Sequence, residues 1–548
     1  MHAPVDRRRA ARKWLLVAVA GALYLWLADD GRHHWHEYRY LYSAAYYRLG
    51  DLVAGAFDAT PPPVKSRAVT GSWYWGQLGH EALLRALVRT FGRGAVAHTA
   101  ILWCYAALTL LGVGAAVRLL RLLPLQLDVT ATGLVLLYFP LTVYLGFKLL
   151  AEVPAFTCGV LACLLWVLAL RAERRGRAAI FSAAAGLALA GSLLCMVYVP
   201  LMFAGLVLAA WGTLGSTLGG TRRIAATTGV VLAVAGSVLA LVWAPFGLTL
   251  RDYLWMYEVY HREYGKPLAA SVFLLGMSGS GLYLAAAASL LSPRVAERRF
   301  LAVWAGAALL PIIVFSGNFL DTRYATVALV PMAGLAVLGV EAIGSRIRRR
   351  PTPFTPRGLR ICAAATALLI TVVTAPLMPF EIDVDDLGQI VARVWSAFPT
   401  ARILVTSNYS DFHFLRFAYP ERPVYLVETP RDDDGRLVRD SAWEARRRAT
   451  YGETFVDDMQ GLRSVARGGP LVYVGYGRLP TLDRLQRLSA RYGISPVSRA
   501  LERMKPRNHL AESWMWGDPR FAFRPWAEIG QYFAYLVTVR DAPDTTRR

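Results

Sequence analysis

The chain has 548 residues, of which 55% are apolar, and its formal net charge is +22. Long apolar runs with hardly a charged residue exclude an ordinary soluble protein of three or four domains, because about 20 such residues are enough to cross a bilayer. We therefore expect a multi-span α-helical membrane protein.

About eleven segments are expected to be transmembrane helices. The block 178–215 is apolar throughout, and its division at Tyr198-Val199-Pro200 follows from length and from the need for a consistent topology. The expected spans lie near residues 14–28, 96–117, 129–147, 149–170, 178–196, 198–215, 224–246, 269–291, 300–316, 324–344 and 359–378.

The positive charge is concentrated in alternate connections between these spans. The segments placed inside hold 22 Lys and Arg in 63 positions, with four acids, whereas the first outer loop, 29–95, holds eight in 67 positions. This asymmetry is that of the positive-inside rule and places the N-terminus inside. A basic surface for nucleic acid is therefore not expected.

The first span and the cysteines add two expectations. The first span ends in LWLADD without a small-residue cleavage pattern, which favours a retained signal anchor. All five cysteines fall within expected spans, so the sequence predicts neither an outer disulfide nor a zinc–cysteine site.

The chain is expected to have two domains. Residues 1–378 would form the transmembrane domain, and residues 379–548 a soluble α/β domain on the outer side of the membrane. Helical patterns cover 386–398 and 481–493, and strand patterns cover 403–408, 424–428, 471–477 and 535–539.

The first outer loop is rich in aromatic and ionisable residues. It opens with DDGRHHWHEYRYLYSAAYY, residues 29–47. Apolar spacing predicts helices within 38–57 and 73–91, separated by the prolines of 61–63 and lying along the membrane. We expect the aromatic side chains at the headgroup level, where tyrosine and tryptophan are enriched.

His36-Glu37 is the first candidate for chemistry in this loop. A carboxylate partly desolvated by aromatic neighbours can act as a general base, although a surface charge is the ordinary alternative. His33, His34 and His36 are also of a type that binds divalent metals, but their spacing matches no defined site. We expect no cofactor and retain a divalent metal as the alternative.

Lys148 and Glu152, in FKLLAEVP, are the second candidate. They are four residues apart, so on a helix they would share a face. Ionisable groups at the edge of apolar helices are costly and usually functional. The alternative is an ion pair that only closes a tight turn.

Arg323 is the third candidate, in NFLDTRYATVALVP at residues 318–331. A guanidinium group suits phosphate because it donates hydrogen bonds in a fixed fork, and a helix N-terminus also favours an anion. The structural alternative is that Asp321 caps the helix and Arg323 is its partner.

Together these segments resemble the GT-C superfamily of integral-membrane glycosyltransferases, in particular the bacterial branch related to protein mannosyltransferases and aminoarabinose-lipid A transferase. HEYRYLYSAAYY (36–47) stands where that family has an acidic pair opening its first outer loop. Glu152 matches an outer-edge glutamate, and Arg323-Tyr324 followed by ATVALVP matches a late span. The family's usual catalytic aspartate aligns with His36, so either Glu37 takes the role or, after a shift, Asp29 or Asp30 does.

The resemblance implies an inverting transfer of a sugar from a polyprenyl-phosphate donor to a lipid, glycan or protein acceptor, at the outer face of the bacterial inner membrane. Glu37 would be the base, and Glu152 would orient Lys148 or the acceptor. Lys148, Arg323 and Tyr324 would bind the donor phosphate. A polymerase or ligase of lipid-linked glycans is the nearest alternative. A flippase is another, although ionisable residues gathered at the outer edge do not favour it.

Overall fold

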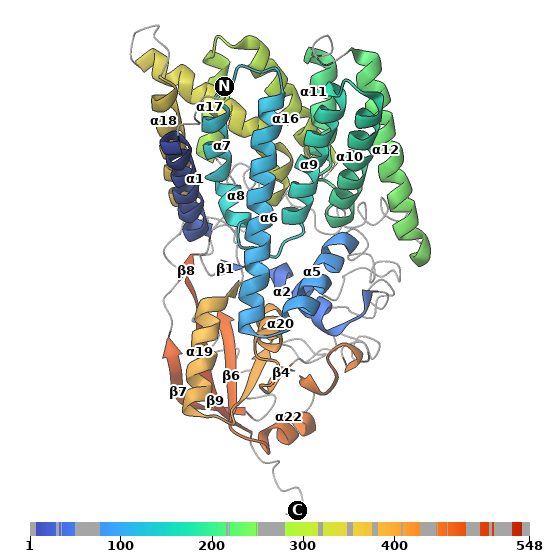
Figure 1. The fold of residues 1–548 in the computed structure, drawn as a ribbon. Coiled ribbons are helices and arrows are strands. Elements are labelled where there is room, and N and C mark those ends of the chain that lie inside the picture. Colours follow the sequence, from blue (N-terminus) through green and yellow to red (C-terminus); the bar gives the residue numbers. More distant parts are fainter. Residues whose placement is uncertain are drawn as a thin grey trace, which may run out of the picture. The chain divides into compact units, whose positions relative to one another are not determined.

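The computed structural model of the chain describes residues 7–28, 32–33, 35–49, 77–214, 218, 220–247, 249, 280–315, 322–347, 355–374, 382–406, 409–427, 445, 448–456, 459–477, 494–503, 507–508 and 529–539. The chain folds as two compact units (Figure 1). Unit 1 comprises Met1–Asp30, Gly76–His80 and Leu102–Met378, and unit 2 comprises Gly31–Trp75, Glu81–Ile101 and Pro379–Arg548. Most of the first outer loop is therefore in the same unit as the C-terminal region. The division at residue 378 into a membrane domain and an outer domain stays a prediction.

The described part of unit 1 consists of helices. The α-helices are α1 (Arg7–Ala28), α6 (Ala95–Leu122, from Leu102 onward), α7 (Val129–Leu137), α8 (Pro140–Leu145), α9 (Glu152–Arg171), α10 (Arg175–Cys195), α11 (Leu201–Leu214), α12 (Thr221–Trp243), α15 (Ser280–Ala288), α16 (Val295–Phe315), α17 (Leu329–Ile347) and α18 (Pro356–Thr374). The short 3-10 helices are η1 (Ala244–Phe246), η2 (Ser289–Leu291) and η3 (Thr322–Ala328).

Five described helical stretches are long and apolar enough to cross a membrane: Ala95–Leu122, Glu152–Arg171, Arg175–Cys195, Thr221–Phe246 and Arg323–Ile347. Each coincides with an expected span. The count of about eleven stays a prediction.

The expected span 129–147 is divided into α7 and α8. Phe139, between them, has an extended backbone with φ −62° and ψ 132°, and α8 then starts at Pro140. Proline lacks the N–H that a continuing helix needs, and it disfavours a helical conformation in the residue before it. One continuous helix here was the wrong interpretation.

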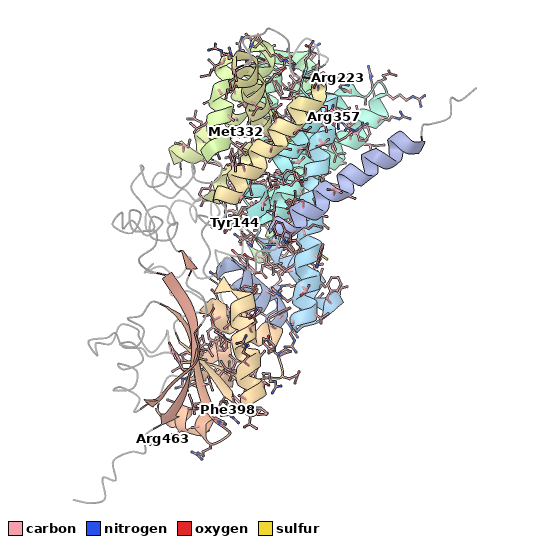
Figure 2. All side chains as sticks on the ribbon, turned by 90° about the vertical axis from the view of Figure 1, so that its left-hand side faces the viewer. Tyr144, Arg223, Met332, Arg357, Phe398 and Arg463 are labelled. Atoms are coloured by element: carbon pink, nitrogen blue, oxygen red, sulfur yellow. The ribbon has the colours of Figure 1, made fainter. Side chains whose placement is uncertain are left out.

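Connections that the charge pattern assigns to one side of the membrane meet in unit 1. Arg360 of α18 pairs with Asp128 at 3.0 Å, and Arg294 pairs with Glu341 of α17 at 2.9 Å. Arg223 and Arg357 lie at the same end of this unit, while Tyr144 lies toward its other end (Figure 2). The basic connections thus gather at one end of the helices.

Unit 2 contains a seven-stranded sheet. Its strands run in the order β5 (Phe455–Val456), β4 (Val424–Val427), β3 (Arg402–Thr406), β6 (Leu471–Gly477), β9 (Ile529–Val539) and β7 (Ile494–Arg503), and β8 (Arg507–Asn508) also pairs with β9. The strands from β5 to β6 are parallel, whereas β9 is antiparallel to β6 and to β7.

Helices alternate with the parallel strands of this sheet. They are α19 (Val384–Ala397), α20 (Tyr409–Ala418) and α22 (Met459–Ala466). On one face, Leu404 and Tyr473 of the sheet form a buried cluster with Leu462 and Val465 of α22. β3, β4, β6 and β9 overlap the four segments that the sequence predicts as strands. The expected helix at 481–493 lies outside the described residues.

Helix α2 (Trp35–Tyr46), from the first outer loop, packs on α20 within unit 2. The Tyr38 ring lies 5.1 Å from Phe414, the Tyr42 ring stacks on His413 at 4.7 Å, and the Tyr46 hydroxyl donates to the Arg416 carbonyl at 2.9 Å. These tyrosines, spaced by four residues, form one face of the helix. They contact protein, which differs from the headgroup placement that we expected.

Candidate active-site residues

Unit 1 brings two of the predicted residues together in a buried ion pair. Glu152 is the first residue of α9, and Arg323 lies on η3, immediately before α17. The Arg323 guanidinium lies 3.2 Å from Glu152 Oε1, and 1% of the Glu152 side chain is exposed against 10% for Arg323. Removing either partner would leave a buried charge without compensation, which is strongly destabilising.

Two tyrosines complete this cluster. The Tyr198 hydroxyl donates to Glu152 Oε1 at 2.8 Å, and the rings of Tyr198 and Tyr324 meet edge to face at 4.5 Å. Glu152 therefore has two partners and a fixed orientation. The structure shows Glu152 paired with Arg323, and its expected role in orienting the acceptor stays a prediction.

Lys148 is also buried, with 1% exposed. It lies between α8 and α9 and outside both helices, so the assumption that Lys148 and Glu152 share a helical face is wrong. α8 ends at Leu145, and the chain turns at Gly146 before Lys148. The Lys148 ammonium lies 5.8 Å from the centre of the Tyr144 ring, within the range of a cation–π interaction.

Glu37 lies in the first turn of α2, in unit 2, and its side chain has no exposed surface. Glu37 is therefore desolvated, as we expected. The role of Glu37 as a general base stays a prediction. Tyr38, the next residue, bonds to His98 Nε2 at 3.1 Å. The ring of His98 is therefore held by a neighbour on α2.

Other candidates in this loop have no described side chain. Asp29, Asp30 and His34 lie outside the described residues, as does Asp321. His33 and His36 are described only in their backbone, on β1 (Arg32–His33) and α2. Within the described residues, no group of three or more histidine, cysteine, aspartate or glutamate side chains is placed to hold a metal. The histidine metal site therefore stays an untested alternative.

A second buried glutamate in unit 2 was missed at the sequence level. Glu81 lies on α5 (Leu78–Phe91), with no exposed surface, and Ser43 Oγ of α2 is 2.8 Å from its Oε1. Arg85, one turn later, has a guanidinium nitrogen 3.9 Å from Glu81 Oε2.

Burial raises the pKa of Glu81 to about 8, against the lowering effects of the Ser43 bond and of the charges of Arg85 and Arg39. Desolvation outweighs the ion pair because the carboxylate is fully buried and 3.9 Å is long for a direct contact. Ser43 Oγ donates to the Glu81 carboxyl group and also lies 2.8 Å from the Tyr40 carbonyl. Because the hydroxyl has one hydrogen, the Glu81 carboxyl and the Tyr40 carbonyl compete for it.

The apolar spacing of α5 contains a signal for Glu81. Phe91 is one of the apolar residues of the predicted helix within 73–91, yet the structure leaves it 43% exposed. The buried positions include Leu78, Glu81, Leu84, Arg85 and Val88, which recur at intervals of three and four. Two ionisable residues on such a stripe indicate a buried polar site.

The fold is similar to that of ArnT from Cupriavidus metallidurans. The apo structure of ArnT has a TM-score of 0.53 with 15% identity, and the alignment covers 96% of this chain and 98% of ArnT. The structure of the same protein bound to undecaprenyl phosphate has a TM-score of 0.52 with the same identity and coverage. The fold that the sequence resemblance implies is therefore confirmed.

An oligosaccharyltransferase of Archaeoglobus fulgidus in the apo form is more distant. It has a TM-score of 0.43 and 11% identity, and the alignment covers 84% of this chain and 69% of the other. This similarity is too weak to establish a shared fold. No family model and no curated protein sequence matches the chain.

Proposed function

We propose that this protein is a membrane glycosyltransferase that moves a sugar from a polyprenyl-phosphate donor to an acceptor on the outer face of the membrane. The fold supports this proposal, since it is shared with ArnT, which has been crystallised with undecaprenyl phosphate. The acceptor would be a lipid, a glycan or a protein. The protein would lie in the bacterial inner membrane with its N-terminus in the cytoplasm and unit 2 outside.

The observation that carries the proposal is the buried group of charges in unit 1. Lys148, Glu152 and Arg323 are all buried in unit 1, and Arg323 is paired with Glu152. A buried cation is costly in an apolar surrounding and is commonly retained for a ligand or substrate. A lipid phosphate has the complementary charge, and Arg323 is already held in place by Glu152.

The proposed reaction is a single inverting displacement. The acceptor oxygen forms a bond to the anomeric carbon while the bond from that carbon to the phosphate oxygen breaks, and the polyprenyl phosphate leaves with the electron pair. Glu37 takes the proton of the acceptor hydroxyl. Lys148 and Arg323 stabilise the charge that grows on the departing phosphate, and fixed cations are effective there because they need no reorganisation.

Purified protein supplied with radiolabelled polyprenyl-phosphate sugars and a lipid extract tests the proposal through release of polyprenyl phosphate. We expect the wild-type protein to release polyprenyl phosphate. Glu37→Gln should release it about 100-fold or more slowly, because a general base has been removed. Glu453→Gln, at an exposed position of unit 2, is the matched control and should release the lipid at the wild-type rate.

Two results would count against the proposal. If Glu37→Gln turns over normally, Glu37 is not the base, and Asp29 and Asp30 become the candidates. If no donor is consumed under any condition, the transfer reaction itself is refuted, and transport of a lipid-linked sugar takes its place.

A further inference from the structure

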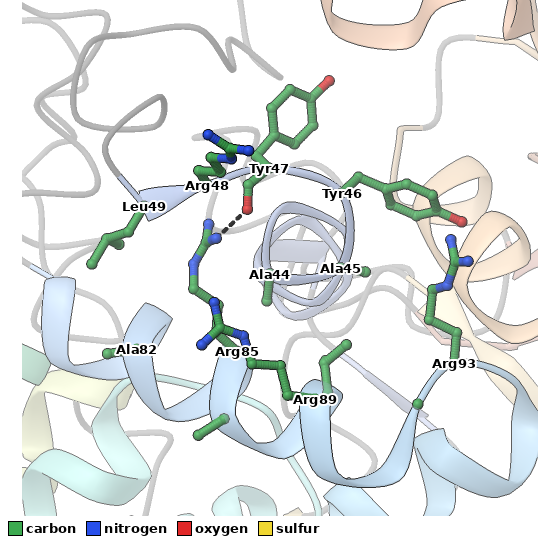
Figure 3. A pocket seen from close by; sticks show the side chains of 13 residues that line it. Ala44, Ala45, Tyr46, Tyr47, Arg48, Leu49, Ala82, Arg85, Arg89 and Arg93 are labelled. Carbon is green, nitrogen blue, oxygen red and sulfur yellow. Dashed lines mark hydrogen bonds between the residues drawn. The ribbon is translucent and has the colours of Figure 1, made fainter.

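A cavity of about 850 Å³ lies within unit 2, between the C-terminal ends of α2 and α5 (Figure 3). This volume is in the range of small-molecule pockets. Four of its lining residues are arginines, Arg48 after α2 and Arg85, Arg89 and Arg93 on or just after α5. The last three are four residues apart, so those on the helix share its face. Among the described residues that line the cavity, none carries a carboxylate.

Two of these guanidinium groups are held in position by neighbours. Arg85 is largely buried and donates to the Ser43 carbonyl at 3.4 Å and to the Tyr47 carbonyl, on the α2 side. The Arg93 guanidinium lies 4.9 Å from the centre of the Tyr46 ring. Such contacts reduce the rotamer freedom that a ligand would otherwise have to remove on binding.

Three of these arginines have no acidic partner among the described residues. Within the described part of the chain, no carboxylate pairs with Arg48, Arg89 or Arg93. Glu81 lies beside Arg85, but its raised pKa of about 8 keeps it mostly protonated at neutral pH. Arg48, Arg89 and Arg93 thus line a concave space without a carboxylate partner among the described residues.

Helix ends explain only part of this charge. α2 and α5 both end at the cavity, and each helix C-terminus carries about half a negative charge. Two ends therefore offset about one positive charge. The charges of Arg48, Arg89 and Arg93 that are not offset repel one another unless an anion or solvent ions screen them.

We propose that Arg48, Arg85, Arg89 and Arg93 form a binding site for a phosphate-bearing group. Guanidinium groups bind phosphate through paired N–H donors, and several of them around one cavity suit a dianionic or doubly phosphorylated ligand. The ligand is either the headgroup of an anionic lipid at the membrane surface or a soluble phosphorylated sugar. This site is built from residues other than those proposed to bind the donor, and it does not depend on the transferase activity.

The test uses the full-length protein in phosphatidylcholine nanodiscs, without any sugar donor. One arm measures retention of phosphatidylglycerol by native mass spectrometry, and the other measures glucose 6-phosphate binding by titration calorimetry. We compare wild type with Arg48→Ala/Arg89→Ala, which leaves the buried Arg85 intact. Arg174→Ala/Arg177→Ala removes the same charge from exposed positions of unit 1 and is the control.

We expect one of the two probes to bind about tenfold or more weakly to Arg48→Ala/Arg89→Ala, as expected for losing two charge-assisted contacts. Arg48→Lys/Arg89→Lys should restore part of the affinity, because lysine keeps the charge but lacks the fork. Loss of lipid retention identifies a headgroup site, and loss of sugar phosphate binding identifies a soluble ligand. Equal binding of both probes to wild type and Arg48→Ala/Arg89→Ala, or an equal loss in the control, would overturn the proposal.

Discussion

Glu152 of unit 1 and Glu81 of unit 2 are both buried glutamates with an arginine beside them, yet their surroundings differ. Glu152 lies 3.2 Å from Arg323, which is 171 residues later in the chain, and also accepts a bond from Tyr198. Glu81 lies 3.9 Å from Arg85 on its own helix and bonds to Ser43. The first is a direct ion pair between two elements, whereas the second is a loose pair in which burial raises the pKa of Glu81 to about 8.

The two arginines therefore differ in how much of their positive charge is offset by the neighbouring glutamate. Arg323 is paired with Glu152, and that pair fixes the direction of its guanidinium group. Glu81 offsets little of the charge of Arg85 at neutral pH, because Glu81 is mostly protonated, and Arg85 lines a cavity with three other arginines. The same two residue types thus give an oriented pair in one unit and a positively charged cavity in the other.

The largest effect is expected at the Glu152–Arg323 pair. Arg323→Ala should destabilise the protein by about 3–5 kcal/mol, because it leaves a buried carboxylate without its partner. Thermal unfolding in detergent micelles measures this loss. Glu152→Ala/Arg323→Ala should be more stable than Arg323→Ala alone. Equal stability of Arg323→Ala and wild type would show that the pair is not formed.

The pH dependence of stability should show whether Glu81 keeps its proton in the folded protein. The pKa of Glu81 is about 8 in the folded protein and 4.5 ordinarily, so between these values only the folded state keeps the proton. Stability should therefore fall as pH rises, by about 1.4 kcal/mol per pH unit, and level off above pH 8. Thermal unfolding of wild type and Glu81→Gln between pH 5 and 9 measures this slope as a difference.

Glu81→Gln removes the titrating group and keeps a side chain of similar shape, so its stability should lack this slope. At pH 7 it should be at least as stable as wild type, because Glu81 already carries a proton there. Parallel pH profiles for the two proteins would mean that Glu81 is ionised throughout, as an ordinary ion pair with Arg85 would be.

Ser43→Ala should have a smaller effect, about 1 kcal/mol, since it removes the hydroxyl that links Glu81 to the Tyr40 carbonyl. It should also raise the pKa of Glu81 further, because the Ser43 bond lowers that pKa. Infrared difference spectra across pH, with Glu81→Gln as the reference, measure the carboxyl band. A downward shift of the midpoint in Ser43→Ala would contradict the arrangement.

The smallest effect is expected for Arg48→Ala/Arg89→Ala in the absence of ligand. Both side chains are exposed, and exposed substitutions usually change stability by no more than about 0.5 kcal/mol. Removing two of four like charges should offset the loss of favourable contacts with the helix ends. A destabilisation above about 2 kcal/mol in thermal unfolding would give these arginines a structural role instead of a binding role.

Sequence alone was sufficient for features that depend on local pattern. Apolar runs located the five described helices that are long enough to span a membrane, and charged residues at their edges drew attention to Lys148, Glu152 and Arg323. Alternation located β3, β4, β6 and β9. A break in a run was also visible at Pro140, but the surrounding apolar residues made one span look continuous.

Features that depend on distant partners were out of reach. Nothing local in the sequence indicates that Glu152 pairs with Arg323 instead of Lys148. The tyrosines of α2 have the spacing of a packed helix face, yet only the fold shows that α20 covers them and the headgroups do not. The arginine cavity requires two helix ends to meet, and its charge depends on a glutamate whose pKa is set by burial.

The central claim, that Lys148 and Arg323 bind the phosphate of a polyprenyl lipid, is tested most directly by the affinity of the purified protein for undecaprenyl phosphate. Lys148→Met keeps an unbranched side chain and removes the charge, and Arg467→Met does the same at an exposed position of unit 2. We predict that Lys148→Met binds the lipid at least about tenfold more weakly, while Arg467→Met binds as wild type does. Wild-type affinity in Lys148→Met would contradict the claim.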